Sequence, residues 1–242
     1  MLESPDMIPG KRVDTQLYLA SNSPRRKEFL ALIKLEYNLL PAQVDETPLT
    51  NEDGVEYVKR IAKSKASTAT SKAGVNGLII AADTAVIGCG MNGKTEIFGK
   101  PKDPNEAVEI LRRLRGHTHQ VLTAISILRS QDSTMLFDLC TTDVPMRNYS
   151  EEEIKAYVAS GDPMDKAGAY AIQHAGFHPV EKLHGCYANV MGLPLCHLTR
   201  SLTQFGTSPK VDVPQTCQAT LGYDCPVYHQ ILKEKTPGIT II

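Results

Sequence analysis

Basic side chains crowd the start of a predicted helix near the beginning of the chain. The residues 17–27, L-Y-L-A-S-N-S-P-R-R-K, predict a short buried strand, a turn, and a helix that begins at Pro24. Arg25 and Arg26 fall in the first helical turn, where the helix dipole already disfavours a cation. Together with the Ser21 hydroxyl and free backbone N–H groups, the two guanidiniums form a cradle suited to phosphate oxygens. A solvated basic surface turn is the alternative interpretation.

Two charged residues interrupt apolar patterns further along the chain. Asp83 lies within the residues 77–86, G-L-I-I-A-A-D-T-A-V, which have the continuous apolar character of a strand covered on both faces. A buried carboxylate needs a metal ion, a cationic partner or a raised pKa, and all three suit a general base or a metal ligand. Lys65 falls in the apolar stripe of a helix predicted for 52–71, so its ammonium either reaches the helix edge or points into a polar cavity. A strand-end aspartate that caps a turn is the alternative for Asp83.

Two further charged residues follow short strand candidates. Glu46 lies between prolines in a loop after the strand candidate 37–40, a position where α/β proteins often carry functional groups. An exposed acidic turn is the alternative for this loop. Lys100 follows a predicted hairpin whose second strand is 95–99, and this hairpin brings Lys100 near Asp83.

The remaining pattern predicts a mixed α/β scaffold. Capping residues precede apolar helical faces at 103–116 and 150–161, and a last helix begins at Pro194. Two β-rich runs, 120–128 and 134–144, predict an antiparallel hairpin.

Small residues surround Gln173 in the segment 162–173, D-P-M-D-K-A-G-A-Y-A-I-Q. Such a composition permits close approach of a ligand or of another backbone. The Gln173 amide carries a paired donor and acceptor that suit the edge of a base, and an amide that stabilises a loop is the alternative.

One main domain with polar ends is predicted. The chain has 242 residues, 42% of them hydrophobic, which is enough for one large core or a core shared by two lobes. Residues 1–16 are polar and predict a mobile leader, and 17–205 predict the domain itself. The residues 206–242 predict a linker, a disordered tail or a small appendage, because they carry prolines and no hydrophobic period.

The composition argues against several classes of protein. The net charge is −1, which favours neither a nucleic-acid partner nor an anionic membrane surface. No apolar run approaches the ~20 residues of a membrane span, and the first residues lack the regions of a signal peptide, so a cytoplasmic location is expected. The six cysteines form no C-x-x-C pair and no zinc-like spacing, which predicts reduced thiols.

Eight short motifs occur in order between residues 17 and 205. They are L-A-S-N-S-P-R-R, V-D-E, K-S-K-A, A-A-D-T-A-V, F-G-K-P, L-R-G-H-T-H-Q-V-L-T, D-K-A-G-A-Y-A-I-Q and N-V-M-G-L-P-L. Together they closely resemble the Maf family of nucleoside triphosphate pyrophosphatases. The resemblance implies a mixed α/β fold related to inosine triphosphate pyrophosphatases, with an elongated, curved sheet, flanking helices and a cleft between two lobes.

The resemblance also implies a reaction and a site. The reaction is hydrolysis of a nucleoside triphosphate between the α and β phosphates with a divalent cation, Mg²⁺ or Mn²⁺. In the implied site, Asp83 is the proton acceptor. The phosphate cradle consists of Ser21, Arg25 and Arg26. Glu46, Lys65 and Lys100 complete the polar set. Asp83 and Glu46 are the candidate metal ligands, and the sequence leaves open which carboxylate binds the metal and which takes the proton.

Substrate choice is implied at three positions, Arg26, Thr84 and Gln173. The form D-K-A-G-A-Y-x-I-Q resembles the subfamily that acts on dTTP, UTP and modified pyrimidine triphosphates more than the subfamily that acts on 7-methyl-GTP. Ala171 and His174 replace glycines expected around Gln173. Two alternatives stay open: a non-catalytic nucleotide-binding regulator linked to cell division, and a purine pyrophosphatase of the inosine triphosphate type. A homodimer is expected at the level of the family.

Overall fold

A computed structural model describes residues 15–72, 74–90, 95–234 and 239–241. Within these residues the strands form one seven-stranded sheet. The strands are β1 (Leu17–Leu19), β2 (Asn38–Leu39), β3 (Leu78–Cys89), β4 (Thr95–Phe98), β5 (Thr118–Arg129), β6 (Thr134–Pro145) and β7 (Ile239–Ile241). The helices are α1 (Pro24–Leu32), α2 (Gly54–Thr70), α3 (Pro104–Leu114), α4 (Glu151–Ala159), α5 (Tyr187–Val190), α6 (Leu195–Gln204), α7 (Val213–Leu221) and α8 (Tyr228–Lys233).

The sheet is mixed and elongated. Its strand order is β2-β1-β3-β5-β6-β7, and β4 pairs with the far part of β3. β1 is parallel to β2 and β3, whereas the pairs formed by β3, β4, β5, β6 and β7 are antiparallel. Three central strands of 12 residues each give the sheet its length. The mixed α/β fold expected from the sequence is therefore confirmed.

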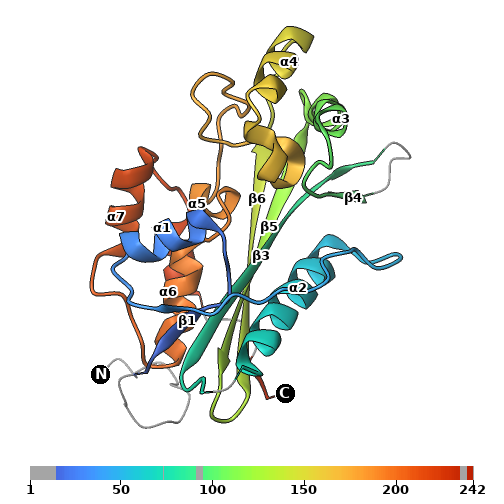
Figure 1. Ribbon diagram of the computed structural model, residues 1–242. Helices are drawn as coiled ribbons and strands as arrows, with labels where there is room; N and C mark the ends of the chain where they lie inside the picture. The colour runs from blue at the N-terminus through green and yellow to red at the C-terminus, as the bar shows by residue number, and fades with distance from the viewer. Residues whose placement is uncertain (1–14, 73, 91–94, 235–238, 242) are drawn as a thin grey trace.

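Different helices cover the two faces of the long strands. Ala124 is aligned with Asp83 across β3 and β5, and it belongs to the apolar cluster beneath α2. The next residue, Ile125, is aligned with Asp138 on β6 and belongs to the apolar cluster beneath α6. Because successive strand residues point to opposite faces, the two aspartates lie on opposite faces of one sheet. Figure 1 shows α2 on one side of the long strands and α6 on the other.

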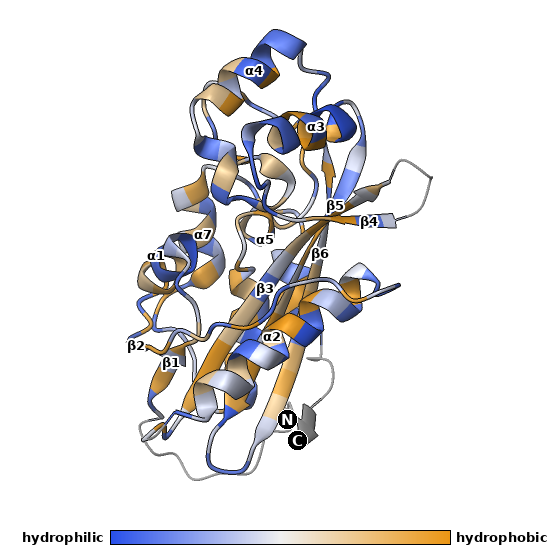
Figure 2. Cartoon of the chain, turned by 45° about the vertical axis from the view of Figure 1, so that its right-hand side comes forward, coloured by the Kyte–Doolittle hydropathy of each residue, from blue (hydrophilic) through white to orange (hydrophobic). Residues whose placement is uncertain are grey.

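Two helical groups flank opposite ends of the long strands. α3 and α4 gather at one end, and α1, α5, α6 and α7 lie beside the other (Figure 1). Each group has its own apolar cluster, which matches the expectation of two lobes. Figure 2 shows that the long strands are mainly hydrophobic, in keeping with their cover on both faces. Leu198 and Leu202 on α6 are fully buried, and each such leucine contributes about 1.5 to 3 kcal/mol relative to exposure.

One edge of β3 is open between the lobes. β1 pairs with β3 over 78–80, and β4 pairs with β3 over 86–89. Among the described strands, residues 81–85 of β3 pair only with β5. The chain leaves the end of β1 towards Ser21 and leaves the end of β4 towards Lys100, so both segments reach this gap from opposite sides.

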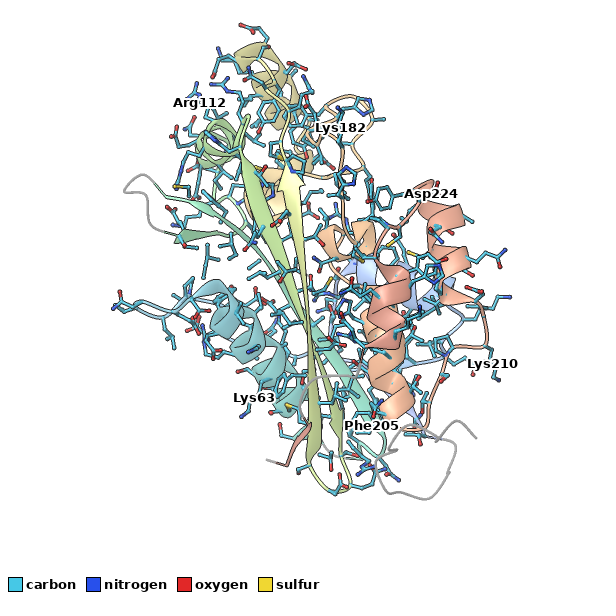
Figure 3. All side chains as sticks on the ribbon, turned by 180° about the vertical axis from the view of Figure 1, so that it is seen from behind. Lys63, Arg112, Lys182, Phe205, Lys210 and Asp224 are labelled. Carbon is cyan, nitrogen blue, oxygen red and sulfur yellow. The ribbon has the colours of Figure 1, made fainter. Side chains whose placement is uncertain are left out.

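The segment after residue 205 is folded. α7 is capped by the Asp212 side chain and has Pro214 in its first turn, and Val213 is buried in the cluster beneath α6. Ile231 on α8 is also buried, and β7 pairs with β6. Lys210 and Asp224 mark the two ends of the segment around α7 (Figure 3). The prediction of a linker or disordered tail is therefore wrong for the described part of this stretch. Its few apolar residues show no local hydrophobic period, because they are buried by packing against elements that are distant in the sequence.

Most of the predicted amino-terminal leader lies outside the residues that the structure describes. Residues 1–14 of the predicted leader 1–16 are outside the described residues. The Gln16 carbonyl oxygen accepts a hydrogen bond of 2.9 Å from the backbone N–H of Leu78, so residue 16 is attached to the sheet. Of the helices in the described part of the chain, none has both the length and the apolar character of a membrane span.

Candidate active site

A cleft of about 900 Å³ lies at the open edge of β3. Its lining includes all nine residues singled out from the sequence, namely Ser21, Arg25, Arg26, Glu46, Lys65, Asp83, Thr84, Lys100 and Gln173. These residues come from six separate segments of the chain, so only the fold brings them together. Their chemical roles remain predictions, which the geometry below supports.

Lys65 joins the two predicted carboxylates. Its Nζ lies 2.7 Å from Oδ1 of Asp83 and 2.7 Å from Oε1 of Glu46. Asp83 and Lys65 are buried, whereas the Glu46 side chain is about half exposed. Of the two possibilities for Lys65, the ammonium points into a polar cavity. Asp83 has the cationic partner that its burial requires.

The two carboxyl groups differ in proton affinity. Burial raises the pKa of Asp83 above its ordinary range, and the charge and hydrogen bond of Lys65 offset this only in part. Burial would also raise the pKa of Glu46, but the hydrogen bond and charge of Lys65, with the charges of Lys100 and Arg26, bring this pKa below its ordinary value. Asp83 is therefore the better proton acceptor of the pair near neutral pH.

Arg26 is held from three sides. Its Nη1 donates to Ser21 Oγ at 3.3 Å, its Nη2 to Thr84 Oγ1 at 3.2 Å, and its Nε to the Gly192 carbonyl oxygen at 3.0 Å. Burial lowers the pKa of the Arg26 guanidinium, and the negative charges of Asp83 and Glu46 partly offset that effect. A buried, fixed guanidinium is a preorganised cation for an anionic ligand.

The first turn of α1 is not the fully solvated surface turn that was the alternative to a phosphate cradle. Arg26 turns inward and is buried, while Arg25 is partly exposed on the cleft wall. Ser23 occupies the N-cap position, but its side chain makes no capping hydrogen bond. Its own N–H donates instead to Ser21 Oγ at 3.2 Å. The following N–H groups at this helix start are suited to an anion.

Part of the cleft lining comes from two short 3₁₀ helices and the loop after them. These helices are Asp162–Asp165 and Ala167–Ala169, and Gln173 follows them on the cleft wall. The Lys166 Nζ is engaged by the Asp165 carboxylate at 2.6 Å. Gly168, with a φ of 72°, could not carry a side chain here, because an added Cβ would lie 2.9 Å from Val86. The small residues noted in the sequence thus permit close packing against β3.

Several residues of the cleft carried no predicted role. The Gly192 carbonyl oxygen accepts a hydrogen bond from Arg26. Gly192 lies in the N-V-M-G-L-P-L motif, but the sequence did not reveal this contact. Lys166 was noted within its motif but given no role. Asn22, Asp165 and Met191 also lie in the quoted motifs without an assigned role, whereas Glu28 and Gln43 gave no signal in the sequence. Charged and polar surface positions of this kind resemble ordinary solvated residues in a pattern analysis.

Comparison with known proteins identifies the family. The family model described as "Maf-like protein" matches residues 16–205, and the chain belongs to this family. A protein of Shigella sonnei named dTTP/UTP pyrophosphatase is 41% identical over 191 residues, which cover 79% of this chain and 93% of the relative. A Geobacter protein of the same name is 39% identical over 193 residues, covering 80% and 97%. The structure of the Staphylococcus aureus Ham1 protein aligns with 86% of this chain and 98% of its own, at 16% identity and a TM-score of 0.41.

Proposed function

We propose that this protein hydrolyses dTTP, UTP and modified pyrimidine triphosphates to the monophosphate and pyrophosphate. Membership of the Maf-like family and the names of relatives about 40% identical support this proposal. The structural observation that carries it is Asp83, a buried carboxylate with a raised pKa at the open edge of β3, bonded to Lys65 in a cleft rich in cations.

Phosphate binding is assigned to the cations of the cleft. Arg26 offers a fixed guanidinium, and Arg25 and Lys100 line the same cleft as Asp83. A triphosphate carries about four negative charges, so several cations are needed before water can approach the phosphorus. The N–H groups at the start of α1 supply further donors for phosphate oxygens.

Asp83 is assigned as the general base. It takes a proton from the attacking water as the new P–O bond forms and the bond between the α phosphorus and the leaving pyrophosphate oxygen breaks. The raised pKa of Asp83 brings its basicity closer to neutral pH, where proton transfer is more favourable. Lys65 holds Oδ1 of this carboxylate and stabilises negative charge in the cleft.

The carboxylates also fit a divalent cation. Asp83 and Glu46 both reach the same Lys65 ammonium at 2.7 Å, so they converge on one point of the cleft. Among the described residues no group of three or more metal-binding side chains occurs, and Mg²⁺ is commonly held by one or two carboxylates together with substrate phosphates. When bound, Mg²⁺ or Mn²⁺ would neutralise charge on the phosphates and on the leaving pyrophosphate.

One assay panel tests the proposal. The purified protein is incubated with dTTP, UTP, 5-methyl-UTP, 7-methyl-GTP and ITP, each with Mg²⁺ or Mn²⁺, and pyrophosphate is measured against orthophosphate. We expect pyrophosphate from the pyrimidine triphosphates and only with metal present. Preference for ITP would favour the purine alternative, and nucleotide binding without pyrophosphate release would favour the regulator. Light scattering of the same sample tests the expected homodimer.

A further inference from the structure

The buried hydroxyl of Thr123 contacts Thr84, which accepts a hydrogen bond from the Arg26 guanidinium. Thr123 lies on β5 directly opposite Thr84 on β3, and it is fully buried. The two hydroxyl oxygens are 2.9 Å apart. The Thr123 hydroxyl also lies 3.3 Å from the Asn189 carbonyl oxygen, to which it can donate. Thr123 therefore contacts the cleft only through other residues.

Both contacts of Thr123 lead to acceptors of Arg26. Thr84 accepts a hydrogen bond from Nη2 of Arg26. The Asn189 carbonyl accepts a second hydrogen bond, of 2.9 Å, from the N–H of Gly192, whose own carbonyl accepts from Nε of Arg26. Thr123 thus contacts one acceptor of this guanidinium, Thr84, directly. It is connected to a second, the Gly192 carbonyl, through the Asn189 carbonyl that both residues contact.

One arrangement of the hydroxyl hydrogens satisfies the contacts of Thr123 with Thr84 and Asn189. A threonine hydroxyl donates one hydrogen and can accept others. If Thr123 donates to the Asn189 carbonyl, then Thr84 donates to Thr123, and the Thr84 oxygen is free to accept from Arg26. The hydrogen bonds then run in one sense from Arg26 to the backbone of α5.

The Asn189 side chain anchors the far end of this chain of bonds. Its Nδ2 donates to the Val121 carbonyl oxygen and to Thr142 Oγ1, both at 2.9 Å. These contacts attach α5 to β5 and β6, and Asn189 is fully buried. The turn that carries Gly192 is therefore fixed to the sheet from which Thr84 also comes. In an interior of low dielectric such connected networks hold their members in fixed positions.

We propose that Thr123 is a positioning residue that sets the Arg26–Thr84 pair for substrate binding. This inference rests on the proposed function, because the resemblance associates Arg26 and Thr84 with substrate choice. Thr123 acts on the affinity and selectivity for the nucleotide, since Arg26 binds the ligand, and it leaves the Asp83 chemistry on the opposite face of the strand unchanged.

The test compares Thr123→Val with the wild-type protein. We expect KM for dTTP, and the Kd for its non-hydrolysable α,β-methylene analogue measured by calorimetry, to rise about five- to tenfold. We expect kcat to stay within about twofold, and the preference for dTTP over 7-methyl-GTP to fall. Thr123→Ser keeps the hydroxyl and restores both affinity and selectivity.

Ser126→Ala is the matched control. Ser126 lies on the same strand, is equally buried, and its hydroxyl has no hydrogen-bond partner in the described part of the chain. Its removal deletes a buried hydroxyl without touching the network, so KM, Kd and selectivity stay at wild-type values. Thr84→Val combined with Thr123→Val should weaken binding by less than the product of the single effects, because both act on one acceptor.

The outcomes separate this inference from the proposed function. A lower melting temperature for Thr123→Val with unchanged KM, Kd and selectivity would show a structural role only and overturn the inference. Effects of Thr84→Val and Thr123→Val that multiply fully would also contradict it. If the wild-type protein binds the analogue but releases no pyrophosphate, the proposed function fails, while the Kd comparison still decides the role of Thr123. A wild-type protein that neither binds nor hydrolyses dTTP would overturn both.

Discussion

Asp83 and Asp138 are buried carboxylates on opposite faces of one sheet, 5% and 2% exposed, and each meets a cation from the helix that covers its face. On the α2 face, Oδ1 of Asp83 accepts a hydrogen bond from Lys65, and within the described residues Oδ2 accepts none. On the α6 face, both oxygens of Asp138 accept hydrogen bonds from side chains of one helix, namely His197, Arg200 and Ser201.

The two environments move the pKa values in opposite directions. Burial opposes ionisation of both groups, and at Asp83 burial prevails, so the pKa is raised. At Asp138 the hydrogen bonds from Arg200 and His197 outweigh burial, so the pKa is lowered. Hydrogen-bond saturation, rather than burial, therefore separates a carboxylate suited to proton transfer from one that stabilises the fold.

The strongest test of this comparison is Asp83→Asn. The amide cannot take a proton, so we expect pyrophosphate release from dTTP to fall about 10²- to 10⁴-fold under saturating metal. The melting temperature should be unchanged or higher, because the substitution removes a carboxylate whose ionisation burial disfavours. Near-normal release would show that Asp83 is not the general base, and thermal unfolding of the same sample provides the stability control.

Asp138→Asn should give the converse result. The substitution leaves the buried Arg200 without its main anionic partner, which costs about 3 to 5 kcal/mol of folding stability. Urea unfolding measures this loss. Pyrophosphate release per folded molecule should remain near the wild-type value, since Asp138 lies on the face away from Lys65. A variant that is stable but inactive would contradict the structural assignment.

The pH dependence of folding stability should also differ between the wild-type protein and the Asp138→Asn variant. Because the folded-state pKa of Asp138 lies below the unfolded value of about 3.9, the unfolded state binds more protons in the interval between them. The stabilisation by Asp138 is complete above about pH 5 and is lost as the pH falls through the folded-state pKa. We expect the difference in unfolding free energy between wild type and Asp138→Asn to shrink below about pH 4. A difference that stays constant down to about pH 2 would contradict the lowered pKa.

Local patterns predicted much of the fold. The helix predicted from capping residues at 150–161 corresponds to α4, where Ser150 and Glu153 form a capping box, because both partners lie within one turn of the helix. The helix predicted for 52–71 corresponds to α2, Gly54–Thr70. The buried pairing of Asp138 was not predicted, because the α6 residues that bind it lie about 60 positions away and leave no local pattern.

The sequence by itself determined which chemical groups this protein has and the element on which most of them lie. Lys65 in an apolar helical stripe and Asp83 in an apolar strand each stood out as a charge that is costly to bury without a partner. The tertiary structure alone decided that these two are each other's partner, that Glu46 joins them, and that a gap between β1 and β4 opens β3 to the cleft. Hydrophobic periodicity specifies which face of an element is buried, whereas strand register and helix packing specify what it meets there.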